Sequence, residues 1–213
     1  SCSVYGNTTE LPVTEESPLE KTESPYAYTK RIGEMMVDDF IKANKGLRAM
    51  SLRYFNPVGA HITGFNGELS IVRPNNLVPF ITQTAIGKIK SLTVYGSDYA
   101  TKDGTCVRDY IHVSDIANAH VLALDYLLNE DVTLNHDIIN LGTGVGVTVL
   151  EAIHAFEKVS GVKLNYTIGE RRDGDVAAIY ANNEKARKLL GWTPQYNLED
   201  MMLSAWKWEQ YIF

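Results

Sequence analysis

A tyrosine and a lysine four residues apart are the strongest chemical signal in the sequence. In Tyr26-Ala27-Tyr28-Thr29-Lys30, Tyr26 and Lys30 share one face of any helix that contains them. A free tyrosine, with a pKa of about 10, is a poor base at neutral pH, whereas a neighbouring ammonium group favours the phenolate. The pair could therefore act as a general base. Taken alone, the pattern is more often an accidental surface pair, so its meaning depends on the surrounding sequence.

Arginines next to aspartates form the second signal. The formal net charge is −6 at pH 7, so the chain offers no basic field to nucleic acid or to an anionic membrane, and an anionic ligand would be met by a few local arginines. Arg108-Asp109 and the run Arg171-Arg172-Asp173-Gly174-Asp175 are such places, because a guanidinium is the usual bidentate partner of phosphate oxygens. In isolation, surface salt bridges within these segments are the better interpretation.

Helical and strand-like segments alternate along almost the whole chain, which predicts an α/β fold with a largely parallel sheet. Ser24-Pro25 is a typical helix start, and the apolar spacing that follows predicts a helix of about 20 residues from Pro25. The four residues from Ser1 to Val4 are expected to be the end of a strand whose beginning is absent. Further helices are expected at 77–89, 114–128, 148–159 and 198–211, and strands at 48–55, 92–95, 137–141 and 163–167.

Three other patterns are interpreted as structural. The segment 140–146 follows a strand and precedes a helix, but Val147 stands where a dinucleotide fingerprint has its third glycine, so a tight turn that lines a cleft is expected. Cys2 and Cys106 fit neither a disulfide scaffold nor a zinc site and favour a reducing cytosol. The five histidines have no ligand spacing, so no metal site is expected, and no apolar run is long enough to cross a membrane.

Several longer motifs, in order along the chain, give these patterns a common meaning. Residues 1–6 (Ser-Cys-Ser-Val-Tyr-Gly), Ser24-Pro25-Tyr26 with Lys30, and residues 53–61 (Arg-Tyr-Phe-Asn-Pro-Val-Gly-Ala-His) closely resemble the extended short-chain dehydrogenases/reductases. Within that family, the segments similar to the UDP-glucose 4-epimerases are 74–77, 103–113 and 171–175. The resemblance covers essentially the whole chain and begins inside the catalytic serine strand, so an NAD-binding N-terminal half is expected to be absent.

The resemblance implies an α/β fold that is the C-terminal part of a Rossmann-like fold plus a smaller α/β substrate-binding domain. Residues 1–60, with 110–142 returning to them, would belong to the NAD-binding domain, and residues 61–109 and 143–213 mainly to the sugar-nucleotide domain. Also implied are NAD as cofactor, a UDP-hexose as substrate, a cytoplasmic location and a homodimer formed through the Tyr26 helix. The reaction would interconvert UDP-glucose and UDP-galactose by transient oxidation at sugar C4.

The resemblance also assigns roles to single residues. Tyr26 would be the active-site base, Ser1 would hydrogen-bond the reacting hydroxyl and Lys30 would bind the nicotinamide ribose; these three and Phe55 would contact the cofactor. The residues implied in binding the sugar nucleotide are Ser1, Tyr26, Tyr54, Asn56, Asn75, Asn76, Leu77, Thr93, Val94, Tyr95, Arg108, Arg172, Asp175 and Ile179. In this family a large tyrosine at position 179 narrows the pocket against N-acetyl groups, so Ile179 predicts some activity on UDP-GlcNAc.

Two alternatives stay open. Dehydratases of this fold place an Asp-Glu pair just after the serine or threonine, where this chain has Cys2 and Ser3, which cannot transfer that proton at neutral pH. An epimerase is therefore preferred over a dehydratase or decarboxylase. The chain could instead be a non-catalytic binding module, although the presence of Ser1, Tyr26 and Lys30 together argues against it. Without an NAD-binding half, the chain is expected to be inactive and prone to aggregate.

Overall fold

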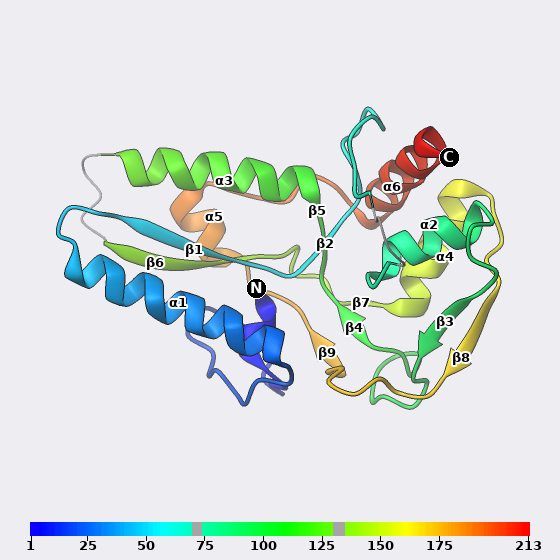
Figure 1. Cartoon of the computed structure of the whole chain (residues 1–213), viewed down its shortest axis with the longest axis horizontal. Helices are drawn as coiled ribbons and strands as arrows, with labels where there is room; N and C mark the ends of the chain where they lie inside the picture. Colours follow the sequence, from blue (N-terminus) through cyan, green and yellow to red (C-terminus); the bar gives the residue numbers. More distant parts are fainter. Residues whose placement is uncertain (70–73, 130–134) are drawn as a thin grey trace.

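The computed structural model describes residues 1–69, 74–129 and 135–213, in which helices alternate with short and mostly parallel strands. The polypeptide forms two halves side by side (Figure 1). The first half contains β1 (Ala49–Tyr54), β6 (His136–Leu141), α1 (Pro25–Ala43), α3 (Val113–Leu128) and α5 (Glu184–Leu190). The second half contains α2 (Leu77–Ala85), β3 (Leu92–Tyr95), α4 (Val149–Ser160), β8 (Tyr166–Gly169) and α6 (Leu198–Ile212). The predicted α/β class is confirmed.

Short strands carry the chain from one half to the other. β2 (Asn56–Val58) follows β1 directly and pairs in parallel with β5 (Tyr110–His112), which leads into α3. β4 (Val107–Arg108) lies between β7 (Val147–Thr148), which is antiparallel to it, and β9 (Ala178–Ile179), which is parallel. The pairs β1–β6 and β3–β8 are parallel as well. The described strands thus form four small sheets, whereas the sequence predicted one largely parallel sheet.

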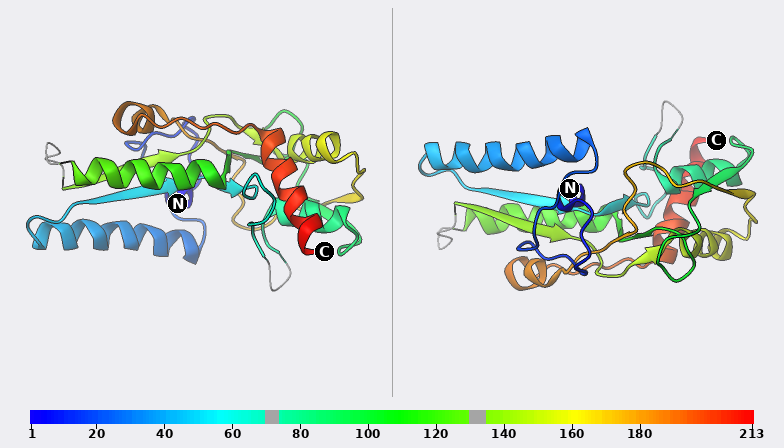
Figure 2. Two further views of the ribbon diagram at one scale, coloured as in Figure 1. Left: turned by 90° about the horizontal axis from the view of Figure 1, so that it is seen from above. Right: turned by 90° about the horizontal axis from the view of Figure 1, so that it is seen from below.

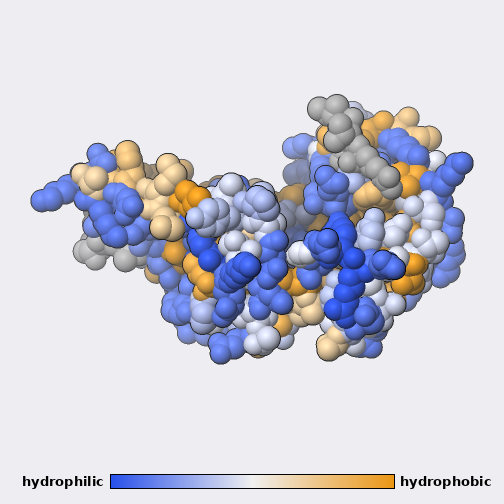
Figure 3. Space-filling view, turned by 60° about the horizontal axis from the view of Figure 1, so that its bottom comes forward, coloured by the Kyte–Doolittle hydropathy of each residue, from blue (hydrophilic) through white to orange (hydrophobic). Residues whose placement is uncertain are grey.

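The helix that carries Tyr26 begins where the sequence predicts. The Ser24 hydroxyl accepts a hydrogen bond from the Ala27 N–H at 3.2 Å, and Pro25 occupies the first helical position, where its missing N–H costs nothing. One side of α1 packs on β1, while Met35, Met36 and Phe40 are exposed. Figure 3, which brings this side of the molecule forward, shows apolar side chains gathered over the α1 end. α1 therefore presents an apolar face that the described residues leave uncovered.

Two predicted strands differ from the structure. Residues Cys2–Tyr5 form the 3₁₀-helix η1, because the Val4 and Gly6 N–H groups bond back to the carbonyls of Ser1 and Ser3. The strand predicted over 163–167 begins only at Tyr166, since the Glu157 carboxylate takes the Leu164 N–H at 2.9 Å and ties that segment to α4. The expectation of a strand end at Ser1 to Val4 is therefore wrong.

Two helices also differ. The first, α2, ends at Ala85 rather than at 89, because Gly87 adopts a φ of 88° and its N–H closes the turn on the Thr84 carbonyl. The short α5 was not predicted; its seven residues are too few to show a clear helical repeat. Elsewhere the predicted helices agree with α3, α4 and α6 to within one residue at each end.

Buried side chains form three clusters, and their arrangement positions the site. The first joins α2, α4 and α6 to β3 and includes Ile81 and Phe156. The second joins α3 and α5 to β6 around Trp192. A third, smaller cluster holds the N-terminal segment against β9. In the two views of Figure 2, α1 and α5 lie on opposite sides of the β1–β6 pair. Within the described residues, no helix is both long and apolar enough to cross a membrane.

Candidate functional site

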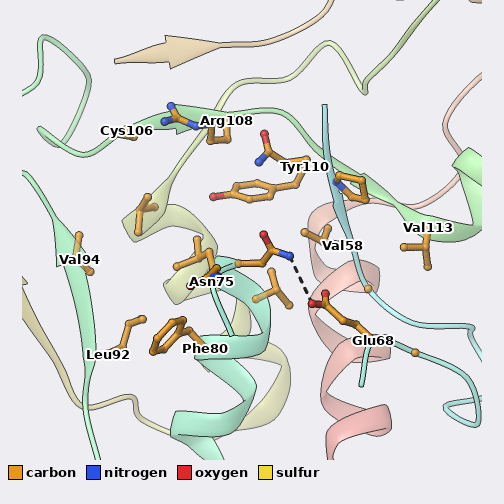
Figure 4. Close-up of a pocket in the computed structure, with 18 of the residues that line it drawn as sticks. Val58, Glu68, Asn75, Phe80, Leu92, Val94, Cys106, Arg108, Tyr110 and Val113 are labelled. Atoms are coloured by element: carbon orange, nitrogen blue, oxygen red, sulfur yellow. Dashed lines mark hydrogen bonds between the residues drawn. The ribbon is translucent and has the colours of Figure 1, made fainter. Parts of the chain in front are cut away.

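A cavity of about 680 Å³ lies where the two halves meet. Its walls come from β2, the start of α2, β3, β4, β5 and the first turn of α3, so both halves contribute. In Figure 4, Arg108 and Tyr110 lie on one wall, and Leu92, Val94 and Phe80 lie on another. The volume is in the range of roughly 300–1,000 Å³ that is usual for small-molecule sites, and the mixture of apolar walls with a few polar groups is typical of them.

Two arginines meet one carboxylate at the cavity wall. Arg108, on β4, lies 3.4 Å from the Asp175 carboxylate, and Arg172 makes two contacts with it, at 3.1 and 3.2 Å. The Arg108 Nη1 also donates to the carbonyls of Val107 and Val176, which fixes its orientation. Hydrogen bonding to Asp175 raises the pKa of the Arg172 guanidinium above its ordinary value. Two cations share one anion, so this wall carries an excess positive charge.

The neighbouring Arg171 makes different contacts. Arg171 donates to the Asp98 carboxylate at 2.7 Å, and its guanidinium lies 4.1 Å from the centroid of the Tyr99 ring. Arg172 instead lines the cavity, 5.2 Å from the Tyr95 ring. Because successive side chains of an extended segment point in opposite directions, adjacent arginines separate in this way. Arg172 thus lines the cavity, and its predicted role of gripping a diphosphate stays a prediction.

The surface salt bridge between Arg108 and Asp109 does not form. Asp109 is fully buried and accepts hydrogen bonds from the N–H and hydroxyl of Thr143 and from the N–H groups of Gly144 and Ala181, at 2.6 to 3.1 Å. Burial raises the pKa of this carboxyl, although the four hydrogen bonds oppose the rise. The glycine-rich turn therefore wraps around a buried carboxylate. The expectation that it lines the cleft is wrong for this cavity, whose walls contain none of its residues.

Most residues predicted to bind the sugar nucleotide come together around the cavity. Asn76, the N-cap residue of α2, donates to Glu68 at 3.5 Å, and both residues line the cavity. Tyr110 was missed, although it lies two residues after Arg108 in an extended segment and is buried against the same space. The predicted residues that line the cavity are Asn56, Asn75, Asn76, Leu77, Thr93, Val94, Tyr95, Arg108, Arg172 and Asp175.

Tyr54, Ile179 and Phe55 lie outside this cavity. The Tyr54 hydroxyl is 2.6 Å from Nε2 of His120 on α3. Ile179 and Phe55 are both 4% exposed and pack together in the small cluster beside the N-terminal segment. β1 ends at Tyr54 and β2 begins at Asn56, so the alternation of side chains is interrupted between them. That break separates the surroundings of Tyr54 from those of Asn56.

Tyr26 and Lys30 lie on the same face of α1, as predicted. The Lys30 ammonium is 5.2 Å from the centroid of the Tyr26 ring, and Tyr26 is 58% exposed in the first turn of the helix. Ser1, whose hydroxyl lies 2.9 Å from that of Ser3, begins the segment that packs against the same helix. Their roles as base, ribose contact and hydroxyl partner stay predictions.

Comparisons with known proteins agree with this geometry. The UDP-glucose 4-epimerase of Drosophila melanogaster is 51% identical to this chain over 209 residues, which are 98% of the chain and 59% of the fly protein. The crystal structure of the Stenotrophomonas maltophila UDP-glucose 4-epimerase, with bound NAD and formylated UDP-arabinopyranose, matches with a TM-score of 0.95 at 44% identity, over 100% of this chain and 62% of that one. The Bifidobacterium longum enzyme, in complex with NAD⁺ and UDP, matches with a TM-score of 0.93 at 44% identity, over 99% of this chain and 62% of that one.

A family model described as GDP-mannose 4,6 dehydratase matches residues 1–204, which is almost the whole chain. The chain spans 59–62% of the length of the three relatives named above. The resemblance noted in the motifs around Tyr26, Asn56 and Arg108 is thereby confirmed. The chain belongs to the GDP-mannose 4,6 dehydratase family of extended short-chain dehydrogenases/reductases, and the relatives it matches are UDP-glucose 4-epimerases.

Proposed function

We propose that the chain supplies the sugar-nucleotide site and the catalytic tyrosine of an NAD-dependent UDP-glucose 4-epimerase, which interconverts UDP-glucose and UDP-galactose. The observation that carries the proposal is the convergence of Arg108 and Arg172 on one carboxylate in a cavity with apolar and aromatic walls. A UDP-sugar needs both the arginines and the apolar walls, because its diphosphate binds guanidinium groups and its uracil binds in an apolar slot. Relatives with 44–51% identity and the same fold bear the epimerase name.

Binding of the diphosphate would redistribute the contacts of Asp175. A diphosphate carries more negative charge than a single carboxylate, so Arg108 and Arg172 would turn to the phosphate oxygens, and Asp175 would become available to the uridine ribose. The apolar wall formed by Leu92, Val94 and Phe80 suits the uracil end. Most of the polar contacts would thus hold the UDP moiety, while the hexose is held loosely.

The residues of this chain fit one end of NAD. Tyr26 and Lys30 form an exposed polar pair, which suits the nicotinamide ribose. The glycine-rich turn does not suit the pyrophosphate, because the N–H groups of Thr143 and Gly144 already point at the Asp109 carboxylate. When bound, NAD supplies a reversible hydride acceptor for the sugar carbon. Its pyrophosphate would be held by an NAD-binding half of the kind that the relatives possess.

The catalytic groups would then move one proton. As phenolate, Tyr26 would remove the proton of the sugar C4 hydroxyl, directly or through the Ser1 hydroxyl. It would return the proton once the 4-keto sugar has rotated to present its other face. The Lys30 ammonium beside Tyr26 would stabilise the phenolate. Loose holding of the hexose lets the 4-keto sugar present its other face, whereas a firm grip on UDP keeps it in the site.

Titration of UDP into the full-length protein tests the proposed binding site. Arg172→Ala is expected to weaken UDP binding at least tenfold, since a hydrogen bond to a charged group contributes about 1.5–3 kcal/mol. Arg187→Ala serves as the control, because Arg187 is exposed on α5 and lies outside the cavity. Equal UDP affinity in the two variants would contradict the assignment of this cavity to the diphosphate.

One observation bears on the dehydratase alternative. Burial raises the pKa of the Cys2 thiol to about 11, so this side chain stays protonated at neutral pH and cannot serve as the base for eliminating water. Ser3 is a still weaker acid. At neutral pH, Cys2 and Ser3 thus provide no ionised base for dehydration, which supports epimerisation over dehydration although the family model bears a dehydratase name.

Substrate range, assembly and location complete the proposal. Ile179 is 4% exposed, packs in the small cluster beside β9 and lies outside the cavity; some turnover of UDP-GlcNAc therefore stays a prediction from the resemblance alone, which a direct assay would decide. The exposed Met35, Met36 and Phe40 of α1 support a homodimer formed through this helix. The free thiols of Cys2 and Cys106 fit a cytoplasmic enzyme.

A further inference from the structure

A buried arginine connects the helix of the proposed base to the segment of the proposed hydroxyl partner. Arg53, on β1, is 2% exposed and makes a bidentate contact with Glu34 of α1, at 2.9 Å through Nε and 2.7 Å through Nη2. Its remaining nitrogen, Nη1, donates to the Tyr5 hydroxyl of η1 at 2.9 Å. The guanidinium also lies 4.8 Å from the centroid of the Tyr5 ring. We call these three residues the Arg53 clamp.

The clamp reaches the reacting groups through short stretches of chain. Glu34 lies one helical turn beyond Lys30 and two turns beyond Tyr26, on the same face of α1. Tyr5 ends the helical turn that begins after Ser1. A second link runs in parallel, because Arg31 of α1 donates to the Val4 carbonyl. Arg53 therefore joins the elements that carry Ser1 and Tyr26. Neither element can shift along the other without breaking a hydrogen bond of the clamp.

The clamp is anchored in the rest of the sheet. The Tyr5 hydroxyl donates to the Asn140 side chain at 2.6 Å, and Asn140 lies on β6 directly opposite Arg53. The Asn140 N–H in turn donates to Glu15 at 2.7 Å. Burial raises the pKa of Tyr5 to about 12, so its hydroxyl keeps its proton and can serve as acceptor and donor at once. Each nitrogen of Arg53 and both carboxylate oxygens of Glu34 thus take part in a hydrogen bond, and the Tyr5 hydroxyl both accepts and donates one, which favours a rigid arrangement.

We propose that Arg53, Glu34 and Tyr5 are positioning residues for the proton transfer at sugar C4: they set the distance between Tyr26 on α1 and Ser1 beside η1. The proposal rests on the proposed function, since it presupposes that Tyr26 and Ser1 act on one hydroxyl. A misplacement of about 1 Å between reacting groups can cost on the order of a hundredfold in rate. The clamp lies outside the cavity lining, so substrate binding should not depend on it.

The geometry also explains why an arginine is needed. A guanidinium presents a planar fork that meets both oxygens of Glu34 and still leaves Nη1 for Tyr5. A lysine would keep the charge but, as a point charge on a flexible stem, could not hold both partners at fixed angles. Arg53→Lys therefore keeps the positive charge beside Glu34 but removes the geometry that positions Glu34 and Tyr5, so its effect reports on positioning alone.

The test compares variants in the NAD-loaded full-length protein. Tyr5→Phe removes one clamp contact and keeps the ion pair, Arg53→Lys keeps the charge, and Glu34→Gln removes the ion pair. The control is Glu209→Gln, which alters a more deeply buried carboxylate, on α6, that accepts hydrogen bonds from Lys88 and Thr82. For each variant, kcat per bound NAD, KM for UDP-galactose, UDP affinity and amide hydrogen exchange in residues 26–32 are measured.

The clamp variants are expected to lose kcat at least tenfold, with KM and UDP affinity within twofold of the parent, and to exchange the amides of residues 26–32 several times faster. Glu209→Gln is expected to change neither kcat nor that exchange by more than twofold. Unchanged kcat per bound NAD in Tyr5→Phe and Arg53→Lys would overturn the proposal, as would an equal loss in Glu209→Gln. If Glu34→Gln fails to fold, the kcat per bound NAD of Tyr5→Phe, which keeps the ion pair, decides whether the clamp positions the reacting groups.

The exchange measurement separates this proposal from the proposed function. A parent protein that folds and binds NAD but does not epimerise UDP-galactose would refute the proposed function. Faster exchange in residues 26–32 of the clamp variants alone would still show that the clamp holds α1 in place. A parent that is active, with clamp variants that exchange and react as it does, would refute the clamp and leave the function standing.

Discussion

The proposed proton transfer depends on an exposed side chain at the beginning of a helix. Tyr26 lies in the first turn of α1 with its ring close to the Lys30 ammonium, and Tyr28, two residues on, is exposed to a similar extent, 56% against 58%. Two residues along a helix amount to more than half a turn, so the two hydroxyls point in different directions. Of the two tyrosines, Tyr26 shares its face with Lys30 and Glu34, so we assign the chemistry to Tyr26.

Removal of a single oxygen tests this assignment. In the full-length protein, Tyr26→Phe is expected to lower turnover of UDP-galactose by about 10² or more, because the general base is lost while the binding surface is kept. UDP affinity should barely change. Tyr28→Phe is the matched control and should retain near-parental turnover. Near-parental turnover of Tyr26→Phe would remove the proposed base from the mechanism.

A buried histidine makes stability depend on pH. His112 is fully buried, its Nδ1 accepts the Ser114 N–H at 3.0 Å, and its Nε2 lies 3.1 Å from the Ser204 hydroxyl. Burial lowers the pKa of His112 below its ordinary value of 6.5, while Asp115 and Asp200 oppose this and His61 adds to it. The unfolded chain therefore takes up the proton first as pH falls. The stabilising contribution is complete above pH 6.5 and is lost as pH falls toward the lower pKa of the folded state.

His112→Asn should weaken this dependence, since asparagine keeps an acceptor at the start of α3 and takes up no proton. Urea denaturation at about pH 7.5 and about pH 5.5 is the measurement, and the loss of unfolding free energy between them should be smaller than in the parent. The exposed His154 provides the control, so His154→Asn should keep the parental loss. An identical loss in His112→Asn would show that His112 does not contribute.

The family resemblance predicted much of the candidate site, whereas residue types and spacing alone favoured surface salt bridges at these arginines. The motif around Arg108 and the run through Arg172 and Asp175 carried a recognisable pattern, and the structure brings all three to one wall. The surroundings of Tyr54 and Ile179 were not predictable, because they depend on how β1 passes into β2 and on how β9 packs on the N-terminal segment. Such contacts between distant segments leave no local signal.

At the scale of elements, capped helices were predictable and short strands were not. The start of α1 follows from Ser24-Pro25, and the starts of α4 and α6 are fixed by reciprocal capping boxes. β4, β7 and β9 are two residues each, too short to show an alternation of apolar and polar residues. These strands form because tertiary contacts bring their backbones together. Although β4 is too short to be predicted, it carries Arg108.

The turn around Asp109 offers a test at this scale. A Cβ on Gly142 would lie 2.4 Å from the Asp109 carboxylate and 2.7 Å from the Ala181 Cβ, so Gly142→Ala is expected to destabilise the protein by about 1–3 kcal/mol. Gly33 lies within α1, and nothing lies within 4 Å of a Cβ there. Gly33→Ala should stabilise the protein by about 0.5–1 kcal/mol. Urea denaturation measures both, and a neutral Gly142→Ala would contradict the tight packing described here.

At the scale of the whole molecule, the site is shared between two halves. The cavity takes Asn56 and Tyr110 from the strands that cross between the halves, and Leu77 and Val94 from the second half. The chain covers 59% of the fly epimerase and 62% of the Stenotrophomonas one. Most of the residues that we propose to bind UDP therefore lie around this one cavity, whereas those that we propose to contact NAD lie at its nicotinamide end.

This division predicts a separation of binding activities. The 213-residue chain by itself is expected to retain no NAD and to turn over no UDP-galactose, because the turn at Thr143 and Gly144 already holds a carboxylate in place of a pyrophosphate. Joining it to an NAD-binding half of the type found in its relatives should restore both. The absorbance of cofactor released after denaturation measures how much NAD the chain retains. Stoichiometric NAD in the chain alone would contradict the inference that the turn at Thr143 and Gly144 does not bind its pyrophosphate.

The product formed from UDP-galactose tests the central claim most directly. The NAD-loaded full-length protein should convert UDP-galactose into UDP-glucose, and UDP-glucose into UDP-galactose, without net formation of NADH, because the hydride returns to the same carbon. Chromatography of the sugar nucleotides identifies the product. A 4-keto-6-deoxy sugar, or no conversion by a protein that binds both NAD and UDP, would contradict the assignment of this chain to an epimerase.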